Sequence, residues 1–318
     1  MSADKLLTIL FNAGIGVSII STVLSLGMSF TVAQVLAPLR RVVPVVLMIV
    51  VNCAVIPAVA WGLFTVFGIK AAYVSGATLA AVGAAGAFGL KAAQLSKHAD
   101  LPLALSAVVV LQILNLAAVP LWAGQVVSGA SISAVTILKD LLLLVLLPLA
   151  IGLLVRARYA DHAREWQPEL VKIANLALGI AVIAGIAANW SVIVSLLGSR
   201  VLIASLVVVV VSLALGFAVG GKNAAARAST GLVSGVRFTA LGMIIIATQL
   251  HGESSYLGPA IVFALVDMIV VMIVALEIGR RARAAASGSG PAAGQAAPGA
   301  AIQASKGQLE SDTQTTEG

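Results

Sequence analysis

Charged residues are scarce in this chain. Only 10% of its 318 residues are Asp, Glu, Lys or Arg, whereas 60% are hydrophobic. A soluble globular domain carries about 25% charged residues, and the mean hydropathy here is +1.10. The shortage of charge therefore excludes a soluble globular protein and indicates an all-α polytopic membrane protein.

Cysteine and recognisable catalytic or metal-binding patterns are also lacking. The single cysteine, Cys53, lies in an apolar run, which excludes an intrachain disulfide and a cysteine-based metal site. No nucleophile–base pair, His/carboxylate cluster or nucleotide-binding loop stands out. The basic residues are spread over loops instead of massed with aromatics, which argues against nucleic-acid binding. We therefore expect no enzyme, no ATP-driven pump, no metal and no organic cofactor.

Nine apolar stretches approach the length of about 20 residues that a helical membrane crossing needs. Membrane β-strands would need only about ten residues in strict alternation, so the stretches are predicted to be helices. The predicted spans are 7–29, 42–66, 73–96, 101–125, 134–155, 170–188, 199–220, 226–249 and 257–279.

The distribution of Lys and Arg predicts the orientation. When the loops are assigned alternately to two sides, twelve basic residues fall on one side and four on the other. Basic residues concentrate in cytoplasmic loops, so the N-terminus is expected outside and the C-terminus in the cytoplasm. The richer side holds Arg40, Arg41, Lys97, Arg156, Arg158, Arg164, Lys172, Lys222, Arg227, Arg280, Arg281 and Arg283. The poorer side holds Lys5, Lys70, Lys139 and Arg200.

Two of the spans, 73–96 and 226–249, are interrupted by clustered glycines. Glycine costs about 1 kcal/mol in a helix interior. In transporters built from inverted repeats, a pair of such interrupted segments in corresponding positions marks the substrate site. Close helix packing through small residues is the alternative interpretation. The glycines expected at the breaks are Gly83, Gly86, Gly89 and Gly235.

These patterns predict a membrane domain over residues 1–283 and a tail. The domain is divided into one repeat of four spans, about 7–125, and one of five, about 134–283. Residues 284–318 are small, polar and Pro-containing, and they carry too little apolar surface to fold. We expect them to form a disordered cytoplasmic tail.

Two charged residues lie near the middle of predicted spans, and a third lies closer to an end. A charge at the bilayer centre costs about 2.5–3.5 kcal/mol on insertion scales and suggests a functional site. Arg237 is predicted to bind an anion, or alternatively to form a structural ion pair. Asp267 is predicted to be a counter-ion for Arg237 or Lys91, or else a proton-coupling carboxyl, since a lone buried charge is costly. Lys91 either adds positive charge to the site or extends to the headgroups.

Uncharged polar residues at similar depth complete the candidate site. Each could bind substrate in a modest polar pocket, or could instead hydrogen bond to a neighbouring helix. They are Asn52, Gln112, Asn115, Ser234 and Thr239.

Four stretches, in order along the chain, resemble the bile acid:sodium symporter family. They are VVNCAVIPAVAWGL (50–63), GAFGLKAAQLSKHADLPLALS (86–106), LLLVLLPLAIGLLVRAR (142–158) and GLVSGVRFTALGM (231–243). The resemblance implies an inverted repeat divided into a panel and a core domain, with two discontinuous helices crossing in the core. It also implies transport of organic anions with sodium by alternating access. The chain matches from the family's second helix onward, which agrees with the 4+5 division and makes spans one, five and six the panel.

The sequence departs from the sodium-coupled members at both crossings. Where those members carry a Gly-Gly-Thr-x-Ser-Asn-like run, residues 86–90 lack the Ser and Asn. Where they carry Glu followed by Gln-Asn, this chain has Val233 and then Arg237-Phe238. Asn52 stands where the family has a polar Gln. The chain thus resembles a divergent bacterial-type member that lacks the usual sodium-site residues, and an inner (plasma) membrane location is expected.

The sequence therefore predicts a secondary active transporter for a small organic anion of the carboxylate or keto acid type. Its expected partners are that anion, the lipid bilayer and a coupling ion, either a proton or sodium. Two other interpretations stay open. One is a sodium-coupled symporter of bile-acid-like or other organic anions. The other is a membrane sensor that binds a ligand without moving it.

Overall fold

The computed structural model describes residues 3–31, 33, 42–127 and 133–288. Residues Met1–Gly279 form one compact unit. Of the predicted tail, residues 284–288 belong to the last helix and residues 289–318 lie outside the described part of the chain.

Seven helical segments of the described residues are long and apolar enough to cross a membrane, so the protein is a polytopic membrane protein. They are Lys5–Ser29, Val45–Val66, Leu101–Val126, Val135–Arg158, Ala160–Ala188, Arg200–Val219 and Ser254–Ala284. The other two predicted spans, 73–96 and 226–249, are each split into two shorter helices. Seven of the nine predicted spans are therefore long enough to cross alone, and the two that are split are those for which the glycine clusters suggested a break.

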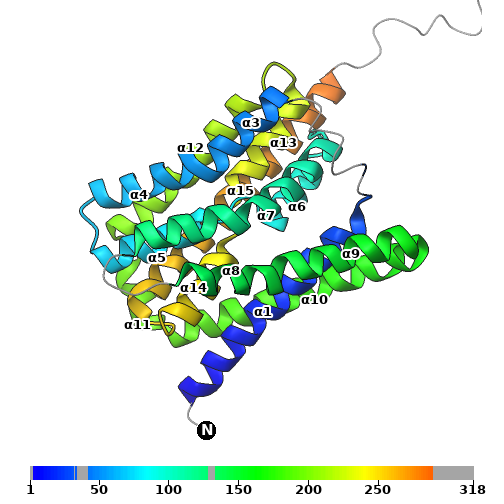
Figure 1. Ribbon diagram of the computed structural model, residues 1–318. Helices are drawn as coiled ribbons and strands as arrows, with labels where there is room; N and C mark the ends of the chain where they lie inside the picture. Colours follow the sequence, from blue (N-terminus) through cyan, green and yellow to red (C-terminus); the bar gives the residue numbers. More distant parts are fainter. Residues whose placement is uncertain (1–2, 32, 34–41, 128–132, 289–318) are drawn as a thin grey trace, which may run out of the picture. The chain divides into compact units, whose positions relative to one another are not determined.

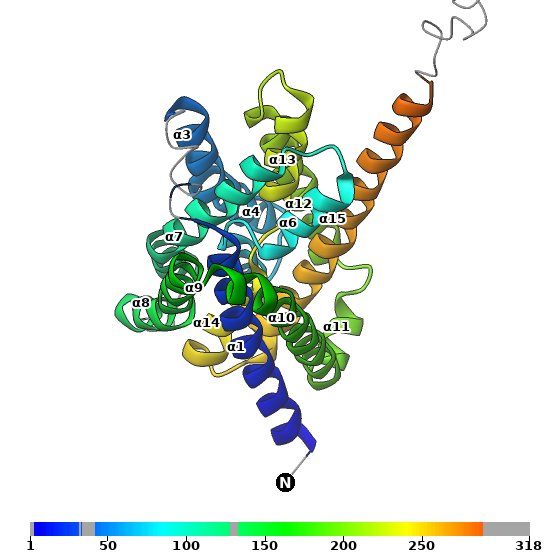
Figure 2. The same cartoon turned by 90° about the vertical axis from the view of Figure 1, so that its right-hand side faces the viewer.

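One group of helices is built around α1 (Ala3–Ser29). This helix packs along α10 (Ala160–Ala188) and α9 (Leu147–Arg158), as Figures 1 and 2 show. Glycines permit the close approach, because a Cβ on Gly27 would lie 2.6 Å from the Leu149 carbonyl oxygen. The helix α9 continues α8 (Ala134–Leu141) through a π-helical turn, η3 (Leu142–Leu146).

A second group surrounds the two broken pairs. The pairs are α5 (Ala71–Val82) with α6 (Ala87–Ser96), and α13 (Ala224–Gly235) with α14 (Thr239–Gln249). A rod made of α3 (Val42–Val50), the π-helical turn η2 (Val51–Val55) and α4 (Ile56–Val66) packs against α5 and α12. The remaining helices are α7 (Leu101–Val126), α11 (Trp190–Leu196), α12 (Arg200–Val219) and α15 (Ser254–Gly288).

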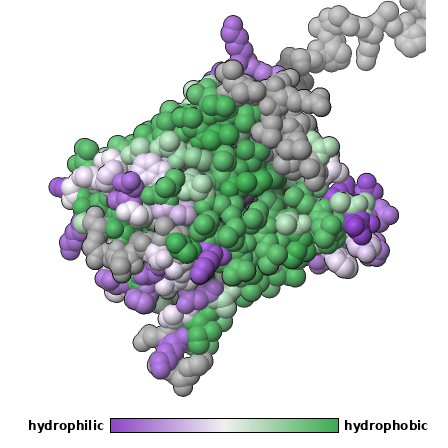
Figure 3. Space-filling view, viewed as in Figure 1, coloured by the Kyte–Doolittle hydropathy of each residue, from purple (hydrophilic) through white to green (hydrophobic). Residues whose placement is uncertain are grey.

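Large apolar side chains cover much of the exterior. Leu176 and Ile183 on α10 are 68% and 71% exposed, and Leu121 on α7 is 72% exposed. In Figure 3 a broad hydrophobic area crosses the middle of the visible face, and hydrophilic residues gather at the end where α9 meets α10. Such a surface suits a hydrocarbon environment, where apolar side chains face lipid.

Candidate functional site

The two helix breaks cross each other. The chain between α5 and α6 runs antiparallel to the chain between α13 and α14, with Ala84 and Arg237 paired as in a β-bridge. The Phe238 N–H donates to the Gly83 carbonyl oxygen at 2.8 Å, and the Gly86 N–H donates to the Val236 carbonyl oxygen at 3.4 Å. Each unwound segment therefore satisfies backbone groups of the other, which a membrane interior requires.

The predicted break glycines lie where the segments approach most closely. A Cβ on Gly83 would lie 2.6 Å from the Phe238 carbonyl oxygen, and one on Gly86 would lie 2.9 Å from that of Arg237. Gly89 approaches the backbone of Val233, and Gly235 packs against a Leu213 side chain. Helix interruption and close packing, which sequence patterns offered as alternatives, occur together here.

Asn115 and Gln112 of α7 hold the first break in place. The Asn115 side chain accepts from the Ala84 N–H and donates to the Ala84 carbonyl oxygen, both at 2.9 Å. Gln112 donates to the Ala85 carbonyl oxygen at 3.0 Å and accepts from Asn115 at 3.2 Å. Both amides are buried, and neither lines the cavity described below.

The guanidinium of Arg237 is enclosed by oxygen atoms. Its Nε donates to the Ala81 carbonyl oxygen at 2.6 Å, and its Nη2 donates to those of Val82 and Asn52 at 2.9 and 3.0 Å. Its Nη1 donates to Asn52 Oδ1 at 3.2 Å. Arg237 is 3% exposed. Four of the five guanidinium N–H donors are thus used by the protein itself.

The local structure explains why these oxygens are available. Ala81 and Val82 end α5, so their carbonyls have no helical partner. Pro57 lacks an N–H and cannot donate to a carbonyl of the preceding turn. In that turn the Asn52 carbonyl accepts from Arg237, and the Cys53 carbonyl accepts from the Trp122 indole at 2.8 Å.

Two predicted residues support this arrangement from either side. The Asn52 amide donates to Ser234 Oγ and to the Met48 carbonyl oxygen, both at 2.9 Å. Asp267 Oδ2 accepts from the backbone N–H of Arg237 at 3.2 Å. Its Oδ1 is buried with no hydrogen-bond partner among the described residues. The carboxylate contacts the Arg237 backbone and makes no hydrogen bond with the guanidinium within the described chain.

A cavity of about 480 Å³ lies beside the crossing. Its walls come from α1, α6, α10, α14 and α15, and both half-helices α6 and α14 begin at its edge. Lys91 is an exposed cation on this wall, and no Asp or Glu is found among the described lining residues. The polar lining residues other than Arg237 are Ser18, Thr22, Ser25, Ser29, Lys91, Gln94, Gln167, Asn175 and Thr239.

Of the predicted site residues, Lys91, Thr239, Arg237 and Gly86 line the cavity. The side chains of α1 and α10 were missed by sequence reasoning. A signal existed in α1, because Ser18, Thr22, Ser25 and Ser29 are spaced by four, three and four residues and so share one helix face. Since hydroxyls are common in membrane helices as packing groups, that spacing alone did not single them out.

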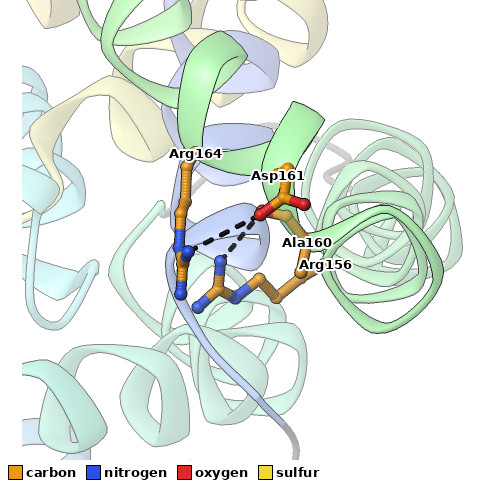
Figure 4. A network of polar contacts seen from close by, with 4 residues as sticks. All are labelled: Arg156, Ala160, Asp161 and Arg164. Carbon is orange, nitrogen blue, oxygen red and sulfur yellow. Dashed lines mark hydrogen bonds and ion pairs between the residues drawn. The ribbon is translucent and has the colours of Figure 1, made fainter.

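A smaller hollow of about 250 Å³ shares Ser29 and Gln167 with the main cavity. Two arginines at the α9–α10 junction, Arg156 and Arg164, line it, and Figure 4 shows both guanidinium groups beside Asp161. Arg164 Nη1 lies 3.6 Å from Asp161 Oδ1, and Arg156 Nη1 donates to the Ala160 carbonyl oxygen at 3.2 Å. Positive charge therefore lies next to one end of the cavity.

Comparison with known proteins yields one family. The model of the sodium bile acid symporter family matches residues 16–225. A comparison with curated proteins finds no match for the chain. The family match begins within α1 and ends at the start of α13, so it includes the first broken pair and not the second break.

Proposed function

Because this chain belongs to the sodium bile acid symporter family, whose members are secondary transporters and not enzymes, we propose that it moves a small organic anion across the membrane by alternating access. One observation carries the choice of an anion. The cavity beside the helix crossing presents Lys91 and several hydroxyl and amide groups, and no acidic residue is found among its described lining residues. A carboxylate or keto acid would find a charge-assisted partner and several hydrogen-bond donors there.

The proposed architecture is an inverted repeat of four and five crossings. The group formed by α1, α8–α9 and α10 corresponds to the panel, and the elements around the two broken pairs correspond to the core. The packing of α1 on α9 and α10 supports this division. So does the position of the cavity, whose walls come from both groups. Relative motion of the groups would then open the cavity to each side in turn.

Lys91 is the residue proposed to contact the anion directly. The guanidinium of Arg237 uses four donors on protein oxygens, so at the cavity wall it contributes mainly a fixed positive charge. The N-termini of α6 and α14 add partial positive charge, because their first N–H groups have no helical partner. Hydroxyls of α1 and the side chain of Thr239 would bind the neutral part of the substrate.

The arginines beside Ser29 are proposed to line the cytoplasmic entrance. They belong to the side that is richer in Lys and Arg, which places the N-terminus outside under the positive-inside rule. An inner membrane location is proposed with this orientation. Positive charge at the mouth of a cavity raises the local concentration of anions.

Uptake by proteoliposomes tests the proposal. Purified protein is reconstituted, loaded with unlabelled carboxylates or keto acids, and assayed for exchange with the labelled compound outside. We expect saturable exchange for at least one such anion and none for matched neutral amides. Binding without exchange would favour the sensor interpretation instead. Exchange of cations or neutral solutes alone would contradict the proposal.

Coupling of transport to protons can be tested separately. If the carboxyl of Asp267, whose Oδ1 has no hydrogen-bond partner among the described residues, carries the coupling proton, net uptake by the wild type should respond to a pH gradient. Asp267→Asn keeps the acceptor for the Arg237 N–H but cannot ionise, so exchange should persist while uptake loses its response to the gradient. The measurement is uptake at equal and unequal pH across the membrane, with Asp140→Asn as the control, since Asp140 lies on α8 and does not line the cavity. Equal stimulation of wild type and Asp267→Asn by the gradient would exclude this role for Asp267.

A further inference from the structure

The Arg237 guanidinium lies where the geometry of the chain creates a cation site. Four oxygens from two separate segments converge on it, namely the carbonyl oxygens of Ala81, Val82 and Asn52 and the Asn52 side-chain oxygen. We refer to these four atoms as the oxygen cage. The residues that supply it are buried, and Arg237 itself is 3% exposed.

The cage has the chemistry that hard monovalent cations prefer. Backbone carbonyls of unwound helices and of helix C-terminal ends are the groups that coordinate sodium in secondary transporters. Here two of the oxygens end α5, where the helix dipole adds partial negative charge. The third carbonyl oxygen belongs to a π-helical turn that precedes Pro57. An empty cage would leave these oxygens unsatisfied in a dry interior, which is costly.

We propose that Arg237 is a tethered cation that permanently fills a monovalent-cation site, so that this protein transports without binding sodium at the cage. A guanidinium keeps its charge under all physiological conditions, and its covalent attachment prevents release during a transport cycle. Its bonds join α5 to η2, while its own backbone bridges to Ala84 in the first break. The covalently attached guanidinium of Arg237 therefore holds the segments of the crossing together throughout the transport cycle.

This inference does not depend on which anion occupies the cavity. It is tested with purified Arg237→Ala in detergent, by thermal unfolding in choline chloride, sodium chloride or guanidinium chloride at equal ionic strength below about 0.1 M, where surface effects of the salts are matched. We expect the variant to melt well below the wild type in choline. Sodium and guanidinium should each raise its melting temperature saturably, by at least about 3 °C, because they bind the folded state.

Arg200→Ala provides the matched control. Arg200 also donates to a carbonyl near a helix end, that of Phe67 at 3.2 Å, but it lies on the surface. Its removal should create no cation dependence. The wild type, whose cage is filled, should show no saturable effect of sodium relative to choline.

Three results would overturn the proposal. One is a variant whose stability responds to no cation, and another is rescue by guanidinium without rescue by sodium. The third is saturable stabilisation of the wild type by sodium, which can be measured even if Arg237→Ala does not yield folded protein. If Arg237→Ala does not yield folded protein, Arg237→Gln replaces it in the salt experiment, because the glutamine side chain is shorter and carries no charge. Because no transported anion is used, failure here is distinguishable from failure of the transport assay.

Discussion

Changing Lys91 to Glu should reduce uptake of the transported anion at least about 100-fold, because a charge-assisted bond worth about 1.5–3 kcal/mol is lost and a repulsion replaces it. The melting temperature should stay near that of the wild type. Lys91 is exposed to the cavity, and neither the Arg164–Asp161 nor the Lys172–Glu169 ion pair involves it. Initial rates in proteoliposomes, measured beside thermal unfolding, separate transport from stability.

Two variants make this result specific to the position of the charge. Lys91→Arg keeps a cation at the cavity wall and should retain transport with an altered KM. Lys97→Glu makes the same charge reversal at the residue that caps the C-terminus of α6, which does not line the cavity. It should leave uptake within about threefold of the wild type, as exposed substitutions remote from a site usually do. Equal effects of Lys91→Glu and Lys97→Glu would indicate that Lys91 serves only the membrane surface.

Much of the fold could be predicted because a bilayer imposes length and polarity on each crossing. The seven uninterrupted spans are found where hydropathy indicated them. The interruptions were also visible, since glycine clusters in 73–96 and 226–249 match the ends of α5 and α13. The two π-helical turns were not predicted, although a proline follows each at the same spacing: Pro57 after Val51–Val55 and Pro148 after Leu142–Leu146.

The candidate site was harder to predict because its contacts join residues far apart in the sequence. Arg237 was recognised as unusual from its depth alone, yet its partners are oxygens of residues 52, 81 and 82. Two of these positions, Ala81 and Val82, have apolar side chains and contribute only backbone. Every residue has a backbone carbonyl oxygen, so the residue type at a position does not predict that this oxygen is a ligand. Depth identified the charge, and tertiary structure was needed to identify what surrounds it.

Asn52, Gln112 and Asn115 illustrate the same limit. Their polarity at membrane depth predicted either substrate binding or contacts between helices. The sequence does not distinguish these two roles. The structure places all three in hydrogen bonds with neighbouring segments and outside the cavity lining. A direct role in substrate binding remains a prediction for the transport assay. Their contacts suit them to position the backbone of the crossing.

Asn115→Ala should lower the melting temperature by about 5–15 °C. The alanine would leave both the N–H and the carbonyl oxygen of Ala84 without their partner, and a buried unsatisfied group costs about 1–3 kcal/mol. The sum is roughly 2–6 kcal/mol, and each kcal/mol shifts the melting temperature by about 2–4 °C in a protein of 150–250 residues, somewhat less in a longer chain. Thermal unfolding in detergent measures the effect directly.

Gln125→Ala on the same helix is the matched control, because Gln125 is exposed. It should change the free energy of unfolding by less than about 0.5 kcal/mol. Asn115→Ala should also weaken transport, since the first break positions Gly86 and the start of α6 at the cavity edge. If Asn115→Ala instead melts within about 2 °C of the wild type, water would have to reach Ala84 in the variant. Water would then reach the crossing of the two helix breaks, and the adjacent oxygen cage would also have to admit water.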